Sequence, residues 1–160
     1  VIGNGLPKRY LNWNNTITYK NFDLNVTMRG AFGFQILNMT EMFWSAPVML
    51  TRGNLRTNAY DPIYGKRPLA DDQSLNYVSY YLENGNYWKI DNVTLGYNLN
   101  LKSKYVKRGR VYLSTANLYT ITGYKGIDPE VGIGGLAPGI DDKNRYPATT
   151  RYTAGARFTC

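Results

Sequence analysis

Five segments of this chain alternate apolar and polar residues, and the connections between them are by turns short and long. We predict strands at about residues 11–20, 22–34, 87–99, 110–122 and 151–160. The connections at 20–21 and 100–109 are short, whereas those at 35–86 and 123–150 are long. In an up-and-down antiparallel sheet, alternate connections lie at the same end. Both short connections therefore fall at one end of the predicted sheet, and both long ones fall at the other.

The alternation gives each strand an apolar face and a polar face, because successive side chains of a strand point to opposite sides. The apolar rows are Trp13, Ile17 and Tyr19; Phe22, Leu24, Val26 and Met28; Val93, Leu95 and Tyr97; and Tyr152, Ala154, Ala156 and Phe158. The polar rows opposite include Asn25, Thr27, Arg29, Thr94, Thr153 and Arg157. No longer stretch has convincing helical periodicity, so we predict an all-β chain.

Two classes of all-β protein fit this pattern. A soluble carbohydrate-binding β-sandwich also has alternating strands with one wet face. An outer-membrane β-barrel has short turns at its periplasmic end and long loops at its extracellular end. The predicted strands match the ~9–11 residues that a tilted strand needs to cross a bilayer. A barrel needs at least about 8 strands, so the barrel interpretation makes this chain a piece of a longer protein.

The third predicted strand contains a slip in its alternation. Trp88 and Ile90 are apolar on one parity, whereas Val93 and Leu95 are apolar on the other. An extra residue in one strand of a pair produces such a shift. We therefore predict a β-bulge, or the boundary of the membrane, within residues 88–91.

The composition excludes several kinds of chemistry. The chain has no histidine and a single cysteine, Cys160, which removes His-dependent nucleophilic schemes and His- or Cys-based metal sites. The acidic pairs at 71–72 and 141–142, and the neighbours Asp128 and Glu130, stand in predicted loops and are interpreted as solvated or turn-forming side chains. We expect no enzyme activity, cofactor or metal. The net charge of +8 is interpreted as a solvated basic surface, with no nucleic-acid partner.

Three collinear blocks resemble a known family. They are "YLENGNYWKIDNVTLGYNL" (81–99), "RVYLSTANLYTITGYKGIDPEV" (110–131) and "YPATTRYTAGARFTC" (146–160). Residues 6–38 resemble the hairpin that precedes these blocks in the family, and 39–80 is the variable part. Together they resemble the C-terminal end of the SusC/RagA-type TonB-dependent transporters of Bacteroidetes.

The resemblance implies a β-barrel of about 22 strands in the bacterial outer membrane, with an N-terminal plug domain that this chain lacks. The implied function is import of oligosaccharides or peptides. The implied partners are a SusD-like surface lipoprotein, which acts as a lid, and TonB–ExbB–ExbD, which acts through the missing N-terminal part. The family usually ends in an aromatic residue, so Cys160 indicates an atypical member or an incomplete end. A soluble carbohydrate-binding β-sandwich is the alternative.

In such a barrel we expect the apolar rows to face outer-membrane lipid and the polar rows to face the plug and the lumen. The two long connections would be extracellular. Among their aromatic residues, Trp44, Tyr60, Tyr64 and Tyr124 are the candidates for contact with substrate or lid.

Overall fold

The computed structural model describes residues 2–62, 78–101, 108–132, 136–142, 146 and 148–159. The chain forms two compact units, each assembled from distant segments. We call the unit that contains the long strands the strand unit; it consists of Arg9–Ala31, Tyr87–Thr122 and Ala148–Cys160. We call the other the loop unit; it consists of Val1–Lys8, Phe32–Asn86 and Gly123–Pro147.

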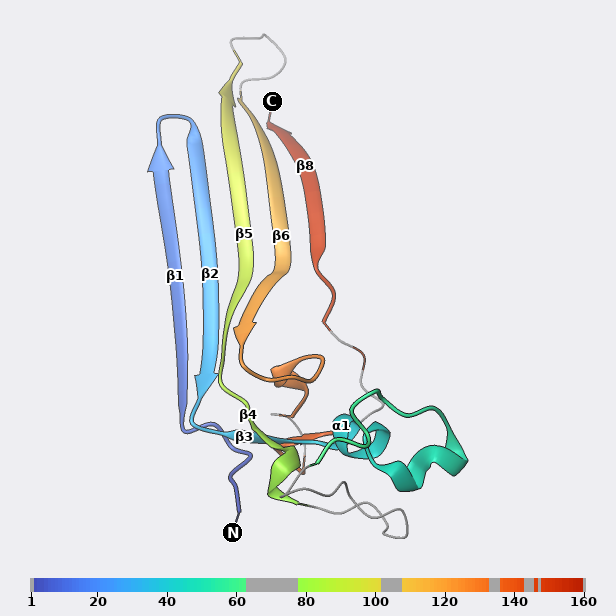
Figure 1. Ribbon diagram of the computed structural model, residues 1–160. Coiled ribbons are helices and arrows are strands. Elements are labelled where there is room, and N and C mark those ends of the chain that lie inside the picture. Colours follow the sequence, from blue (N-terminus) through green and yellow to red (C-terminus); the bar gives the residue numbers. More distant parts are fainter. Residues whose placement is uncertain are drawn as a thin grey trace. The chain divides into compact units, whose positions relative to one another are not determined.

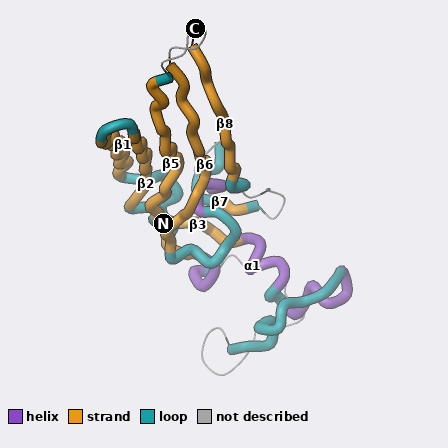
Figure 2. The backbone as a smooth tube through the Cα atoms, turned by 90° about the horizontal axis from the view of Figure 1, so that it is seen from above, coloured by secondary structure: helices purple, strands orange, loops and turns teal. Residues whose placement is uncertain are grey.

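The strand unit is one antiparallel sheet. Its strands are β1 (Arg9–Tyr19), β2 (Phe22–Phe32), β5 (Tyr87–Asn100), β6 (Arg108–Thr122) and β8 (Arg151–Thr159). They lie side by side in chain order, β1-β2-β5-β6-β8 (Figures 1 and 2). The first two strands form the predicted hairpin, which turns at Lys20 with a φ of 55°. The predicted all-β, up-and-down arrangement is confirmed.

The slip in the third predicted strand is a β-bulge. Val26 of β2 pairs with Val93 of β5, and Met28 pairs with Ile90. Two steps along β2 thus correspond to three along β5, so Asp91 is the extra residue. The register between β5 and β6 also shifts at this level. Because the bulge absorbs one residue, Ile90 returns to the same face as Val93, and the predicted bulge is confirmed.

The loop unit contains short elements where the sequence predicts long connections. They are β3 (Gln35–Asn38), α1 (Met39–Trp44), the 3₁₀ helices η1 (Pro47–Arg52), η2 (Ser79–Tyr81) and η3 (Pro129–Gly132), β4 (Leu82–Asn84) and β7 (Ile140–Asp141). The three short strands form a second sheet in the order β4-β3-β7. In this sheet β3 runs antiparallel to β4 and parallel to β7. No helix within the described ranges is long and apolar enough to cross a membrane.

Local chemistry explains the main helix and the core of the loop unit. The side chain of Asn38 accepts a hydrogen bond of 2.9 Å from the backbone N–H of Glu41, which caps the first turn of α1. Ile36 of β3 and Met42 of α1 are both 0% exposed, and Tyr81 of η2 is 1% exposed. This unit therefore has a closed apolar core of its own.

Candidate functional site

The apolar rows of the strand unit form one continuous face. Residues paired directly across neighbouring strands share a face of the sheet. Leu24 of β2 pairs with Leu95 of β5, which pairs with Leu113 of β6, which pairs with Ala154 of β8. An apolar row therefore crosses four strands without a polar side chain.

The side chains of this face are exposed or half-buried. Ile17, Leu113 and Phe158 keep 56%, 52% and 58% of their surface open, and Tyr152 keeps 70%. Soluble monomers rarely expose apolar patches larger than a few hundred Å². A face of this kind is stable where another apolar phase covers it, as in the wall of a membrane barrel.

The contribution of β6 to this face was not predicted from the sequence. The register adds two residues of β5 and four of β6 to it: Trp88, Ile90, Val111, Leu113, Tyr119 and Ile121. Apolar residues alternate in the sequence on both sides of residues 114–117, and this alternation could have located the face. The residues at 114–117 interrupt it, and the register shift at that level cannot be read from one strand alone.

The opposite face carries hydrogen-bonded polar side chains. Asn25 donates to the hydroxyl of Thr16 at 2.9 Å and to the side-chain oxygen of Asn14 at 3.2 Å. Thr94 and Ser114 share a hydrogen bond of 2.8 Å between β5 and β6. These cross-strand contacts join neighbouring strands and pair polar side chains with one another.

Ion pairs lie on the same polar face. Arg29 Nε is 3.1 Å from Asp91 Oδ2, so the bulge residue itself holds one pair. Arg110 of β6 pairs with Asp23 of β2. Gly96 lies directly between their strands, and a Cβ there would stand 2.6 Å from atoms of both side chains. The glycine thus gives the pair room to lie close to the sheet.

The aromatic candidates of the long connections are placed in different surroundings. Trp44 ends α1 and lines a surface hollow of about 280 Å³. Tyr60 is 55% exposed and does not line this hollow. Tyr64 lies outside the described residues. Tyr124 is only 6% exposed, which leaves almost no ring surface for a ligand.

Tyr124 serves the core of the loop unit. Its hydroxyl donates a 2.5 Å hydrogen bond to Asp141 of β7. Burial raises the pKa of the Tyr124 phenol far above its ordinary value, and the hydrogen bond and negative charge of Asp141 raise it further. The phenol therefore stays protonated and ties the segment after β6 to β7.

Glu41 joins α1 to the segment that follows η1. Its carboxylate accepts hydrogen bonds from Ser45 at 2.8 Å and from Asn58 at 2.7 Å, and it pairs with Arg56. The backbone N–H of Arg56 also donates to the carbonyl of Trp44 at 2.9 Å. These contacts hold the guanidinium of Arg56 beside the hollow. In the described residues, no group of three or more acidic or cysteine side chains could hold a metal ion.

Known proteins resemble this chain over most of its length. It is 31% identical over 137 residues to TonB-dependent receptor P3 of Formosa agariphila, covering 81% of this chain and 13% of that protein. It is 32% identical over 143 residues to TonB-dependent receptor SusC of Bacteroides thetaiotaomicron, covering 86% of this chain and 14% of that protein. No protein-family model matches the chain.

A solved structure has the same fold. The RagAB peptide transporter superposes with a TM-score of 0.74 at 24% identity, covering 96% of this chain and 17% of that chain. The chain thus spans about a seventh of the length of the sequence relatives. The match to this barrel structure favours a β-barrel segment over the soluble β-sandwich that the sequence left as the alternative. The chain belongs to the SusC/RagA-type TonB-dependent receptors, and it is a segment of their β-barrel in the bacterial outer membrane.

Proposed function

We propose that this chain forms wall and loops of a TonB-dependent importer that moves oligosaccharides or peptides across the outer membrane. The observation that carries the proposal is a single meander with a continuous exposed apolar face and an opposite face of hydrogen bonds and ion pairs. A barrel wall needs this division, because lipid lies on one side and a polar interior on the other.

The residues then take two roles in the proposal. The apolar face contacts lipid, through the rows that begin at Trp13, Phe22, Val93 and Tyr152. The polar face, with Asn25, Thr27, Arg29, Thr94, Thr153 and Arg157, lines the inside of the barrel. A charged group is costly in hydrocarbon, so the side that carries the ion pairs is the inner one.

The loop unit takes the extracellular role in this proposal. Its hollow, which Trp44 lines, is a candidate contact for the substrate, and the exposed Tyr60 is a second candidate for substrate or lid. A SusD-like surface lipoprotein is the proposed lid, and TonB–ExbB–ExbD acts through the remainder of the protein. The name of the solved relative, a peptide transporter, supports import as the process. The role includes no catalytic step.

Uptake in living cells tests this function. We would delete the gene that encodes this chain and measure uptake of labelled oligosaccharides and peptides from a broad panel. The expected result is loss of uptake for one class, restored when the intact gene is returned and not when TonB is also deleted. Unchanged uptake of every compound in the panel would overturn the proposed function.

A further inference from the structure

We propose that the hollow at the end of α1 binds an anionic sugar, meaning a ring of an oligosaccharide that carries a carboxylate or sulfate. This inference rests on the proposed import function and names a substrate class for it. The hollow belongs wholly to the loop unit and has a volume of about 280 Å³. Its lining residues are Asn38, Thr40, Trp44, Arg56, Lys125, Gly126 and Ile127.

One wall of the hollow is a fixed aromatic ring. Trp44 contacts Phe43 edge-on, with ring centroids 4.8 Å apart and planes at 78°. A Cβ at Gly53 would come within 3.2 Å of the Trp44 ring, so the glycine backbone packs closely against it. Ile127, which is 60% exposed, adds apolar surface to the lining. A sugar ring has apolar C–H faces that pack on such a wall.

The polar part of the lining is cationic. Among the described residues, this lining contains Arg56 and Lys125 but no carboxylate. Two acids contact lining residues: Glu41 pairs with Arg56, and Glu83 accepts hydrogen bonds from the side chain of Asn38 at 3.0 Å and from the backbone N–H of Lys125 at 2.8 Å. These contacts fix the backbone of Lys125 and hold the side chain of Arg56 at the hollow.

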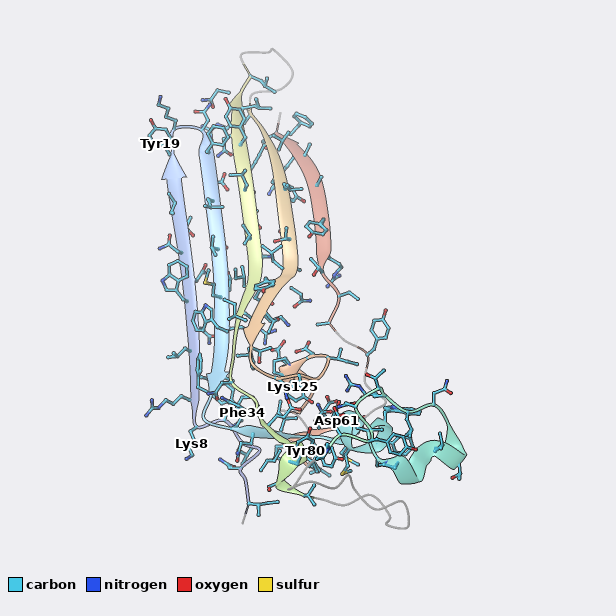
Figure 3. The ribbon with its side chains drawn as sticks, in the orientation of Figure 1. Lys8, Tyr19, Phe34, Asp61, Tyr80 and Lys125 are labelled. Carbon is cyan, nitrogen blue, oxygen red and sulfur yellow. The ribbon has the colours of Figure 1, made fainter. Side chains whose placement is uncertain are left out.

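Lys125 is the cation that a ligand would neutralise. Its side chain is exposed, and the structure gives its ammonium no ion pair with any described residue. Figure 3 labels Lys125 in the segment that follows β6. A carboxylate or sulfate placed here would gain charge-assisted hydrogen bonds, which are roughly twice as strong as neutral ones.

The shape of the hollow favours a sugar over a peptide. Peptides often bind by adding a strand to a free sheet edge. Of the lining residues that the structure describes, only Asn38 belongs to a strand, and this strand, β3, lies between β4 and β7. The hollow, at about 280 Å³, is also slightly smaller than the ~300–1,000 Å³ of typical ligand sites, which suits a single ring.

Binding to the purified intact receptor tests the proposal. The probes are an oligogalacturonide, its fully methyl-esterified form, a sulfated galacto-oligosaccharide and an acidic peptide, each measured by calorimetry. We expect at least one anionic sugar to bind tighter than the neutral ester, with an affinity that falls as salt rises. The proposal is overturned if neither anionic sugar binds tighter than the ester, or if only the peptide does.

Variants locate the binding. Lys125→Gln is expected to weaken binding of the anionic sugar about 10-fold and to leave binding of the ester unchanged. Trp44→Ala is expected to weaken binding of both. The matched control is Lys8→Gln, which removes a cation from a second hollow of about 290 Å³ in the same unit and should change neither. Equal effects of the two lysine variants would contradict the assignment.

The two proposals fail in different ways. If the deletion strain takes up every compound as well as its parent, the import function fails. If import depends on the gene but Lys125→Gln imports anionic and neutral sugars as the wild type does, only the anionic-sugar site fails.

Discussion

Residues of the same type are exposed in the strand unit and buried in the loop unit. Ile17 of β1 is 56% exposed, whereas Ile36 of β3 is 0% exposed. Tyr152 of β8 is 70% exposed, whereas Tyr81 of η2 is 1% exposed. The loop unit thus has a core of the kind that folds in water, and the strand unit directs its apolar side chains outward. This difference supports the proposal that the strand unit faces lipid, whereas the loop unit is built for water.

The largest expected effect compares the two isoleucines. Ile36→Ala should lower the local free energy of opening of the loop unit by about 2–5 kcal/mol, because it removes apolar contacts and leaves a cavity. Ile17→Ala should have a smaller effect in a lipid vesicle, since lipid chains fill the space and no cavity remains. Hydrogen exchange at the amides of β3 and β1 measures both. Equal losses would mean that the two units share one kind of solvent.

A charge placed on the apolar face of β8 gives the next largest effect. Ala154 and Thr153 are neighbours on an exposed strand, and they point to opposite sides of the sheet. Ala154→Arg should destabilise the barrel by up to about 4 kcal/mol, because a cation on the lipid face is most costly near the middle of the bilayer. Thr153→Arg should be tolerated, because the proposed barrel places this residue on the polar inner face. Urea unfolding of the receptor in vesicles measures both, and a greater loss for Thr153→Arg would reverse the assignment of the faces.

Two tyrosines of the loop unit give a third comparison. Tyr124→Phe removes the hydroxyl that donates to buried Asp141 and should cost about 1–3 kcal/mol. Tyr60→Phe changes an exposed ring and should cost close to nothing. Urea unfolding of the loop unit, with limited proteolysis as the readout, measures this difference. A loss at Tyr60 as large as at Tyr124 would contradict the structural role assigned to the buried tyrosine.

The buried hydrogen bond between Tyr124 and Asp141 makes the stability of the loop unit depend on pH. The pKa of Tyr124 is raised in the folded protein, whereas in the unfolded chain it is about 10. The stability contribution of Tyr124 is therefore fully present below about pH 10 and is lost as the pH rises further, because only the unfolded chain then gains from ionising. Proteolysis at increasing pH should show this loss in the wild type and a smaller loss in Tyr124→Phe.

The sequence predicted the parts of the fold that depend on period and on connection length. Alternation located the five strands, and the parity slip near Ile90 located the bulge at Asp91. The faces of β6 were not predicted, because which residues of two strands lie opposite each other depends on pairing rather than on either sequence alone. The burial of Tyr124 could not be read either, since its partner Asp141 is distant in the chain and the two-residue strand β7 is too short to have a period.

The smallest expected effect concerns the polar face. Gly96→Ala would place a Cβ 2.6 Å from atoms of Arg110 and Asp23. The tips of these side chains can move, so we expect a loss of about 1 kcal/mol, as the partly exposed ion pair gives way. Gly123→Ala is the control, because nothing lies within 4 Å of its Cβ position. Urea unfolding in vesicles compares the two. If Gly96→Ala is as mild as Gly123→Ala, the pair between β2 and β6 adds nothing to the barrel, and the polar face is held by its neutral hydrogen bonds alone.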